Sequence, residues 1–218
     1  NSLIVDDLII DKDNKLAKVD KIDLDYLDND NFKNKFIVNR TKNNNYALKG
    51  SLLNANTIIT KLLESKDDQQ LDLLKENINI SLNFSDVYLD NEYVVKNLNG
   101  KLQIIDNKVD QAYISALFED NKDFKFSINT KDGEKITTLY SSKARPFVKK
   151  YKFIKGFEDS NEGYLDFYSS KKDGISNSKL TIDNFKVKEI PALAKILTLA
   201  SLQGIADLLT GEGIRFTD

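Results

Sequence analysis

Strict alternation of apolar and polar residues is the feature that most limits what this chain of 218 residues can fold into. Ile78, Ile80, Leu82 and Phe84 are separated by asparagine and serine. This period of two places all four side chains on one face of a β-strand. The pattern recurs at residues 22–26, 114–118, 124–128 and 180–182. The alternation therefore predicts a sheet with one apolar and one polar face.

Short clusters of Asn, Asp and Gly separate the alternating segments. These residue types adopt turn conformations that other residues resist. The clusters lie at residues 11–14, 43–45, 90–91, 106–107, 120–123 and 131–133. Their spacing favours consecutive antiparallel hairpins over strand–helix–strand units, so we expect a mainly β fold whose sheet is antiparallel, strongly twisted and curled.

Two segments have helical spacing of their apolar residues instead. Residues 57–76 carry leucine and isoleucine at helical intervals with a polar break at 65–70, which indicates one broken helix or two short ones. Residues 191–209 begin at Pro191 and end before Gly211 and Gly213, as a helix with terminal signals does. This second helix is either a core helix that covers one end of the sheet or a lid over an apolar groove.

A weak internal repeat places a glycine two positions before an apolar residue. It occurs at Gly50, Gly100 and Gly163, each of which we place at the start of a strand. Three matches to so short a pattern also arise by chance. A true repeat would indicate a sheet that is extended by similar modules.

The composition removes most catalytic chemistry. Histidine and cysteine are absent, so the usual zinc ligands and the usual base of a nucleophilic triad are missing. We interpret the acidic pairs as solvated loop charges; they are Asp6-Asp7, Asp28/Asp30, Asp67-Asp68 and Glu158-Asp159. Residues 28–31 start like a calcium loop but lack its glycine and its closing glutamate. We therefore expect no enzyme activity, no metal and no cofactor.

The charge balance argues against nucleic acid as a partner. Lys and Arg total 32 and Asp and Glu total 34, which gives a net charge of −2 spread along the chain. Phe124-Lys-Phe126 and Tyr151-Lys-Phe153 could stack bases in an oligonucleotide-binding sheet. Without a basic face, we treat that interpretation as a minor alternative.

The segment from Leu180 to Phe216 resembles the C-terminal region of AsmA-like bacterial envelope proteins, the AsmA, TamB and YhdP group. The similarity covers about 35 residues, in which a strand leads into a proline-started helix, a second helical turn, a Gly-x-Gly stop and a new strand. The positions that carry it most specifically are Pro191, Leu197, Leu202, Gly204, Gly211, Gly213 and Phe216. Residues 141–168 resemble the preceding element of that region, although Arg145-Pro146 stands where the family has a glycine.

The resemblance implies a fold, a location and a function. It implies that residues 1–140 form part of a β-groove, that residues 141–218 form the AsmA-like C-terminal region, and that amphipathic helices lie at the groove's face or ends. We expect the chain to be an internal piece of a longer periplasmic protein, anchored in the inner membrane of a Gram-negative bacterium. Its groove would carry phospholipid toward the outer membrane. The implied partners are phospholipid acyl chains, the rest of the same chain and other envelope proteins.

The alternation supplies the candidates that would line such a groove. They are Ile78, Ile80, Leu82, Phe84, Leu102, Ile104, Ile114, Phe118, Phe124, Phe126, Ile128, Leu165, Phe167, Leu180 and Ile182. One competing hypothesis is a structural or scaffolding envelope domain whose sheet is simply a packed core. Another is a carbohydrate-processing or carbohydrate-binding β-domain, which would need two facing carboxylates in a cleft with aromatic walls.

Overall fold

The structure is a computed structural model that describes most of the chain. The described residues are 1–29, 31–42, 44–56, 77–106, 108–151, 163–187 and 214–216. They belong to two compact units. The first unit comprises Asn1–Leu139 with Tyr168–Ser178, and the second comprises Tyr140–Phe167 with Lys179–Asp218.

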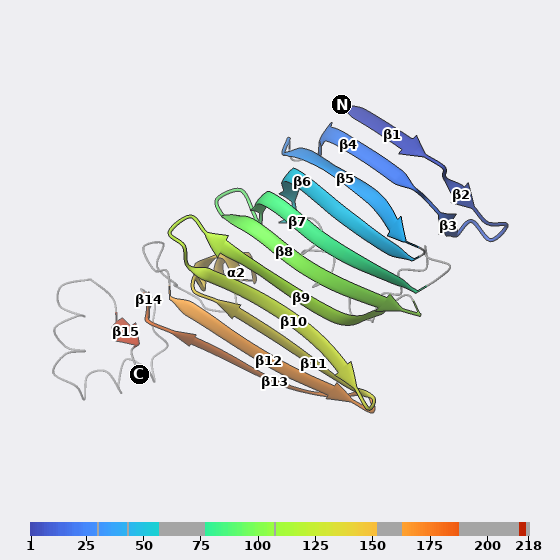
Figure 1. Cartoon of the computed structure of the whole chain (residues 1–218). Helices are drawn as coiled ribbons and strands as arrows, with labels where there is room; N and C mark the ends of the chain where they lie inside the picture. Colours follow the sequence, from blue (N-terminus) through green and yellow to red (C-terminus); the bar gives the residue numbers. More distant parts are fainter. Residues whose placement is uncertain are drawn as a thin grey trace. The chain divides into compact units, whose positions relative to one another are not determined.

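Strands make up most of the described chain (Figure 1). The first unit begins with β1 (Ser2–Asp6), β2 (Ile9–Ile10), β3 (Leu16–Lys18), β4 (Lys21–Leu27), β5 (Lys33–Lys42) and β6 (Asn45–Asn54). It continues with β7 (Ile78–Tyr88), β8 (Val94–Ile105), β9 (Lys108–Phe118) and β10 (Asp123–Lys131). The elements that follow are β11 (Glu134–Ser141), α2 (Arg145–Tyr151), β12 (Tyr164–Lys172), β13 (Ile175–Asp183), β14 (Phe185–Val187) and β15 (Ile214–Phe216).

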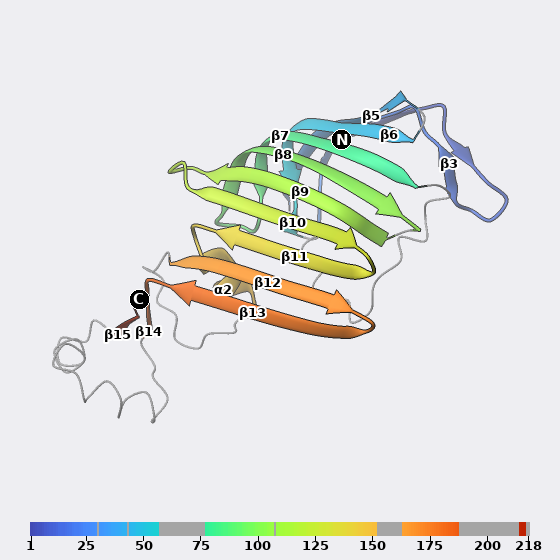
Figure 2. The same ribbon diagram turned by 60° about the horizontal axis from the view of Figure 1, so that its bottom comes forward.

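The large sheet has eleven strands in the order β1-β4-β5-β6-β7-β8-β9-β10-β11-β12-β13. Figures 1 and 2 show the neighbouring strands from β5 to β10 side by side in this order. The mainly β prediction is confirmed, and the alternating segments around residues 22–26, 78–84 and 124–128 lie in β4, β7 and β10.

The expected antiparallel arrangement is broken where β6 and β7 pair in parallel. Parallel neighbours cannot be joined by a tight hairpin and need a crossover connection of a dozen or more residues. The chain from residue 55 to residue 77 supplies this length. The sheet is therefore mixed, because the pairs from β4 to β6 and from β7 to β9 are antiparallel.

Three neighbouring strands each carry one extra residue at the same level. Phe36 and Lys35 are adjacent on β5, but their partners on β6, Gly50 and Leu52, are two positions apart. Ser51 is therefore an extra residue in β6. Asn97 lies in the equivalent shift between β8 and β9 and has a positive φ of 54°. The pairing of β6 with β7, and of β7 with β8, continues past this level without a register shift. Strand β7 therefore carries one extra residue as well. The shifts are therefore β-bulges that change the phase of all three strands together.

The aligned bulges keep the apolar face continuous although the period of two is broken. On β7, Phe84 and Val87 are three residues apart, yet they are only 2% and 1% exposed. On β8, Val95 is fully buried and pairs with Phe118 of β9. Because one residue is inserted, side chains three positions apart return to the same face.

Glycine marks two mid-strand positions rather than strand starts. β6 starts at Asn45 and β8 at Val94, so Gly50 and Gly100 lie inside their strands. The predicted position at a strand start is therefore wrong for both. Gly163 directly precedes β12, where its φ is +54° and its carbonyl accepts a hydrogen bond from the Ala144 N–H at 3.2 Å.

The second unit has a small core of its own. Ala144, Val148 and Leu165 are between 0% and 2% exposed. Helix α2 begins at Arg145-Pro146, where proline fits because the first helical turn has no intrahelical acceptor for its N–H groups.

Strand β14 pairs antiparallel with β15, so residues 185–187 and 214–216 lie beside each other. Phe185 pairs with Phe216, and Val187 pairs with Ile214. The strand predicted at residues 214–216 is thus confirmed. The predicted helices at 57–76 and 191–209 lie outside the described residues, as do Pro191, Leu197, Leu202, Gly204, Gly211 and Gly213.

Candidate functional site

The first candidate surface is the apolar face of the sheet in the first unit. Strand register aligns one residue from each of eight neighbouring strands in a single row. These residues are Val5, Ile22, Val38, Leu48, Leu82, Gly100, Ile114 and Phe126. We call this set the apolar row. Neighbouring strands lie about 4.8 Å apart, so seven spacings give the row a length of about 34 Å.

A second row lies one step along the strands. It places Leu3, Leu24, Phe36, Gly50, Phe84 and Leu98 on six successive strands. The rings of Phe36 and Phe84 contact each other across Gly50. Two parallel apolar rows make a broad surface rather than a single line of side chains.

Burial differs between the two rows. Phe84 and Leu98 of the second row are 2% and 7% exposed. Leu82, Ile114 and Phe126 of the apolar row are half-buried. At the outer end, Leu3 on the edge strand β1 is 63% exposed. The apolar face is therefore closely packed near Phe84 and more accessible along the apolar row and toward β1.

Most of the predicted groove residues share this face. Strand pairing joins Ile78 to Ile104, Ile80 to Leu102, and Ile114 to Phe126. The first-unit candidates that register places together are Ile78, Ile80, Leu82, Phe84, Leu102, Ile104, Ile114, Phe118, Phe124, Phe126 and Ile128. The remaining candidates, Leu165, Phe167, Leu180 and Ile182, belong to the second unit.

The opposite face is polar and holds a feature that the sequence did not reveal. Asn45, Asn79, Gln103, Gln111 and Asn129 lie on five neighbouring strands, and each pairs with the next. We call this set the amide row. Its members are separated by up to 84 residues along the chain, so no local pattern could have found it.

A hollow of about 450 Å³ lies over the amide row. Its polar lining includes Asn79, Ser81, Lys101, Gln103, Gln111 and Tyr113. The Tyr113 side chain is 53% exposed, and Lys101 is its direct neighbour in the β8–β9 ladder. No Asp or Glu is among the described residues that line the hollow.

Asp28 has a different role from the solvated loop charge that we expected. Its carboxylate accepts hydrogen bonds from Nδ2 of Asn54 at 2.6 Å and from Nδ2 of Asn34 at 3.2 Å. Asn34 and Asn54 are 1% and 5% exposed. The side-chain oxygen of Asn34 in turn accepts the Asn54 backbone N–H at 2.7 Å. Asp28 therefore completes a buried polar network that joins β5 to β6.

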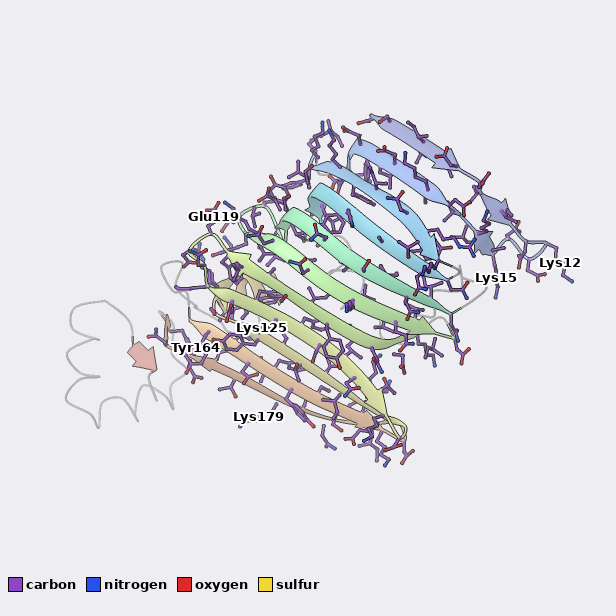
Figure 3. The ribbon with its side chains drawn as sticks, viewed as in Figure 1. Lys12, Lys15, Glu119, Lys125, Tyr164 and Lys179 are labelled. Atoms are coloured by element: carbon purple, nitrogen blue, oxygen red, sulfur yellow. The ribbon has the colours of Figure 1, made fainter. Side chains whose placement is uncertain are left out.

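Two other kinds of site are missing from the described residues. They contain no group of three or more His, Cys, Asp or Glu side chains that could hold a metal ion. No described helix is long and apolar enough to cross a membrane. Figure 3 labels Lys125 on β10 and Glu119 in the turn between β9 and β10.

Comparisons with known proteins were made at the level of families, curated proteins and solved structures. None of the three found a match for this chain.

Proposed function

We propose that the apolar face of this sheet binds phospholipid acyl chains. The chain would be part of a periplasmic, inner-membrane-anchored AsmA-like protein that moves phospholipid toward the outer membrane. The observation that carries the proposal is the apolar row, in which eight neighbouring strands each contribute a residue with no polar side chain.

The energetics of lipid transfer explain why such a surface would suffice without catalysis. Exposing an acyl chain to water costs about 0.8 kcal/mol per CH₂ group, roughly 25 kcal/mol for two long chains. An apolar surface lowers this barrier because the chains move from the bilayer onto hydrocarbon-like side chains while the headgroup stays in water. The row length of about 34 Å is comparable to the bilayer's hydrocarbon thickness of about 30 Å, so whole acyl chains could lie along it.

A scaffolding function is the second candidate, and a specific observation favours it. Phe84, Val87 and Val95 on the apolar face are at most 2% exposed, as expected for a packed core. In a scaffold, the same packing would extend along the whole face and leave no room for lipid. The half-buried residues of the apolar row favour the transport function instead.

Lipid occupancy of the purified chain tests the proposal. We would produce the chain in a bacterial periplasm, purify it without detergent, and measure bound phospholipid by mass spectrometry. Phe126→Glu and Ile182→Glu should lose lipid while keeping the β-rich circular dichroism spectrum. Ser115→Glu is a matched control, because Ser115 is exposed and pairs with Asn99 on the polar face.

Either of two results would overturn the proposal. One is folded wild-type chain that carries no phospholipid, which would leave the scaffolding function. The other is equal lipid content in Phe126→Glu and Ser115→Glu, which would show that the lipid is not bound at the apolar row.

A further inference from the structure

The polar face carries more side-chain hydrogen-bonding groups than form hydrogen bonds within the sheet. In the amide row, the Nδ2 of Asn79 donates to the Oδ1 of Asn45 at 3.0 Å. In the described part of the chain this pairing stops there, and Gln103 and Gln111 make no side-chain hydrogen bond. Primary amides each offer two N–H donors and a carbonyl acceptor. The unused groups therefore point to a ligand that is rich in both donors and acceptors.

The neighbouring row adds an aromatic ring and a cation. Ser81, Lys101 and Tyr113 lie on β7, β8 and β9, each paired with the next, one step along the strands from the amide row. Tyr113 is just over half exposed, so its ring is accessible to a ligand. Amide groups, the Tyr113 ring and Lys101 line the hollow of about 450 Å³ together with Tyr46, Ile80 and Leu102. This volume is within the usual size range of ligand sites.

We infer that this hollow binds a linear oligosaccharide, independently of the proposed lipid function on the opposite face. Side-chain amides pair with sugar hydroxyls, because each hydroxyl both donates and accepts a hydrogen bond. The Tyr113 ring supplies an apolar platform for the C–H face of a sugar. Lys101 adds a positive charge that favours a glycan with carboxylate or other acidic groups.

The repeat of the sheet suits a polymer of sugars. Amides recur across the strands about every 4.8 Å, which is close to the length of one pyranose unit in an extended chain. An oligosaccharide that crosses β6, β7, β8 and β9 would therefore meet an amide at each unit. Asn129 on β10 continues the row beyond the hollow, so a longer glycan would gain one further contact.

Other ligand classes fit this hollow less well. A metal ion needs anionic or neutral oxygen ligands close together, but the only charged group among the described lining residues is the Lys101 ammonium. An acyl chain would leave the amides of Gln103 and Gln111 without hydrogen bonds, which costs free energy at each group. Hydrolysis of a bound glycan would need a pair of carboxylates, so the inference concerns binding alone.

Affinity electrophoresis with the whole chain tests this inference, because it detects weak binding to a soluble polymer. Native gels would contain sodium alginate as the acidic probe or hydroxyethyl cellulose as the neutral probe. We expect sodium alginate to slow the migration of the chain, and hydroxyethyl cellulose to slow it less. Tyr113→Ala should weaken the binding of both probes about tenfold, equivalent to about 1.4 kcal/mol. Lys101→Gln should weaken the binding of alginate alone.

Two controls separate specific binding from general effects. Tyr168→Ala removes another exposed tyrosine, 45% exposed and on β12, and should bind like the wild type. Circular dichroism and thermal melting would verify that each variant is folded. No retardation by either polymer overturns the inference. Equal slowing of the wild type and Tyr113→Ala by alginate also overturns the inference, because binding would then depend on charge alone.

Discussion

The rings of Phe36 and Phe84 lie with centroids 5.9 Å apart and at an interplanar angle of 67°, although their strands are not neighbours. Between them runs β6, which places Gly50 opposite both phenylalanines. The missing side chain lets the two rings meet edge to face above the glycine. Such aromatic pairs contribute about 0.5–1.5 kcal/mol beyond the area they bury.

Replacing this glycine should destabilise the sheet. A Cβ at Gly50 would lie 2.5 Å from the Phe36 Cβ and 2.4 Å from the Lys35 carbonyl oxygen, so the backbone must move. We expect Gly50→Ala to reduce the free energy of unfolding in urea by about 1–3 kcal/mol. Gly100→Ala is the matched control, because its nearest contacts are 3.1–3.2 Å and small shifts relieve them. Equal losses in both variants would contradict the proposed close approach.

The buried network around Asp28 predicts a second stability effect. Asn34→Ala removes the acceptor of the Asn54 N–H and a donor to the Asp28 carboxylate. Buried polar groups left without partners cost about 1–3 kcal/mol, which urea unfolding would measure. Asn83→Ala, which breaks the exposed Asn83–Asn99 side-chain bond of 2.8 Å, should change stability by less than about 0.5 kcal/mol.

The positive φ of Asn97 in the bulge predicts which substitutions at this position keep the stability of the fold. Its φ of 54° is accessible to asparagine and glycine but costly for a β-branched side chain. Asn97→Gly should therefore retain the wild-type stability within about 0.5 kcal/mol, and Asn97→Val should lose about 1–3 kcal/mol in thermal or urea unfolding. At Ser115, which is also exposed on the polar face and pairs with Asn99, valine should be neutral or stabilising. A tolerated Asn97→Val would mean that the bulge is not at this residue.

Stability should fall in acid partly because of Asp25. A hydrogen bond from Lys33, whose Nζ lies 3.2 Å from the carboxylate, holds the pKa of Asp25 below its usual value of 3.8. A carboxyl whose pKa is lower in the folded state stabilises the fold above its unfolded pKa. This contribution disappears as the pH falls through the folded pKa.

Unfolding measured between about pH 6 and pH 2 checks this expectation. Asp25→Asn should be less stable than the wild type at pH 6, and the difference should shrink in acid as Asp25 of the wild type takes up its proton. Asp132→Asn in the β10–β11 turn is the control, since asparagine suits its positive φ of 51°. A difference between wild type and Asp25→Asn that stays constant with pH would show that the ion pair does not stabilise the fold.

Local pattern by itself determined the strands and the two faces. Alternation at Ile78, Ile80, Leu82 and Phe84 is a property of neighbouring residues, and burial of one face follows directly from it. The polar clusters likewise indicated most turns, because turn conformations depend on a few adjacent residues. A sign of the bulges was present too: the apolar positions change phase between Phe84 and Val87, and again between Val95 and Leu98.

Tertiary structure alone decided which strands are neighbours. The parallel β6–β7 pair depends on a crossover connection, and the alternation of a strand is the same in either direction. The amide row and the apolar row both arise from register between segments that are distant in sequence. Register is set by the turns, the bulges and burial of one face acting over the whole sheet, so these two surfaces appear only when the chain has folded.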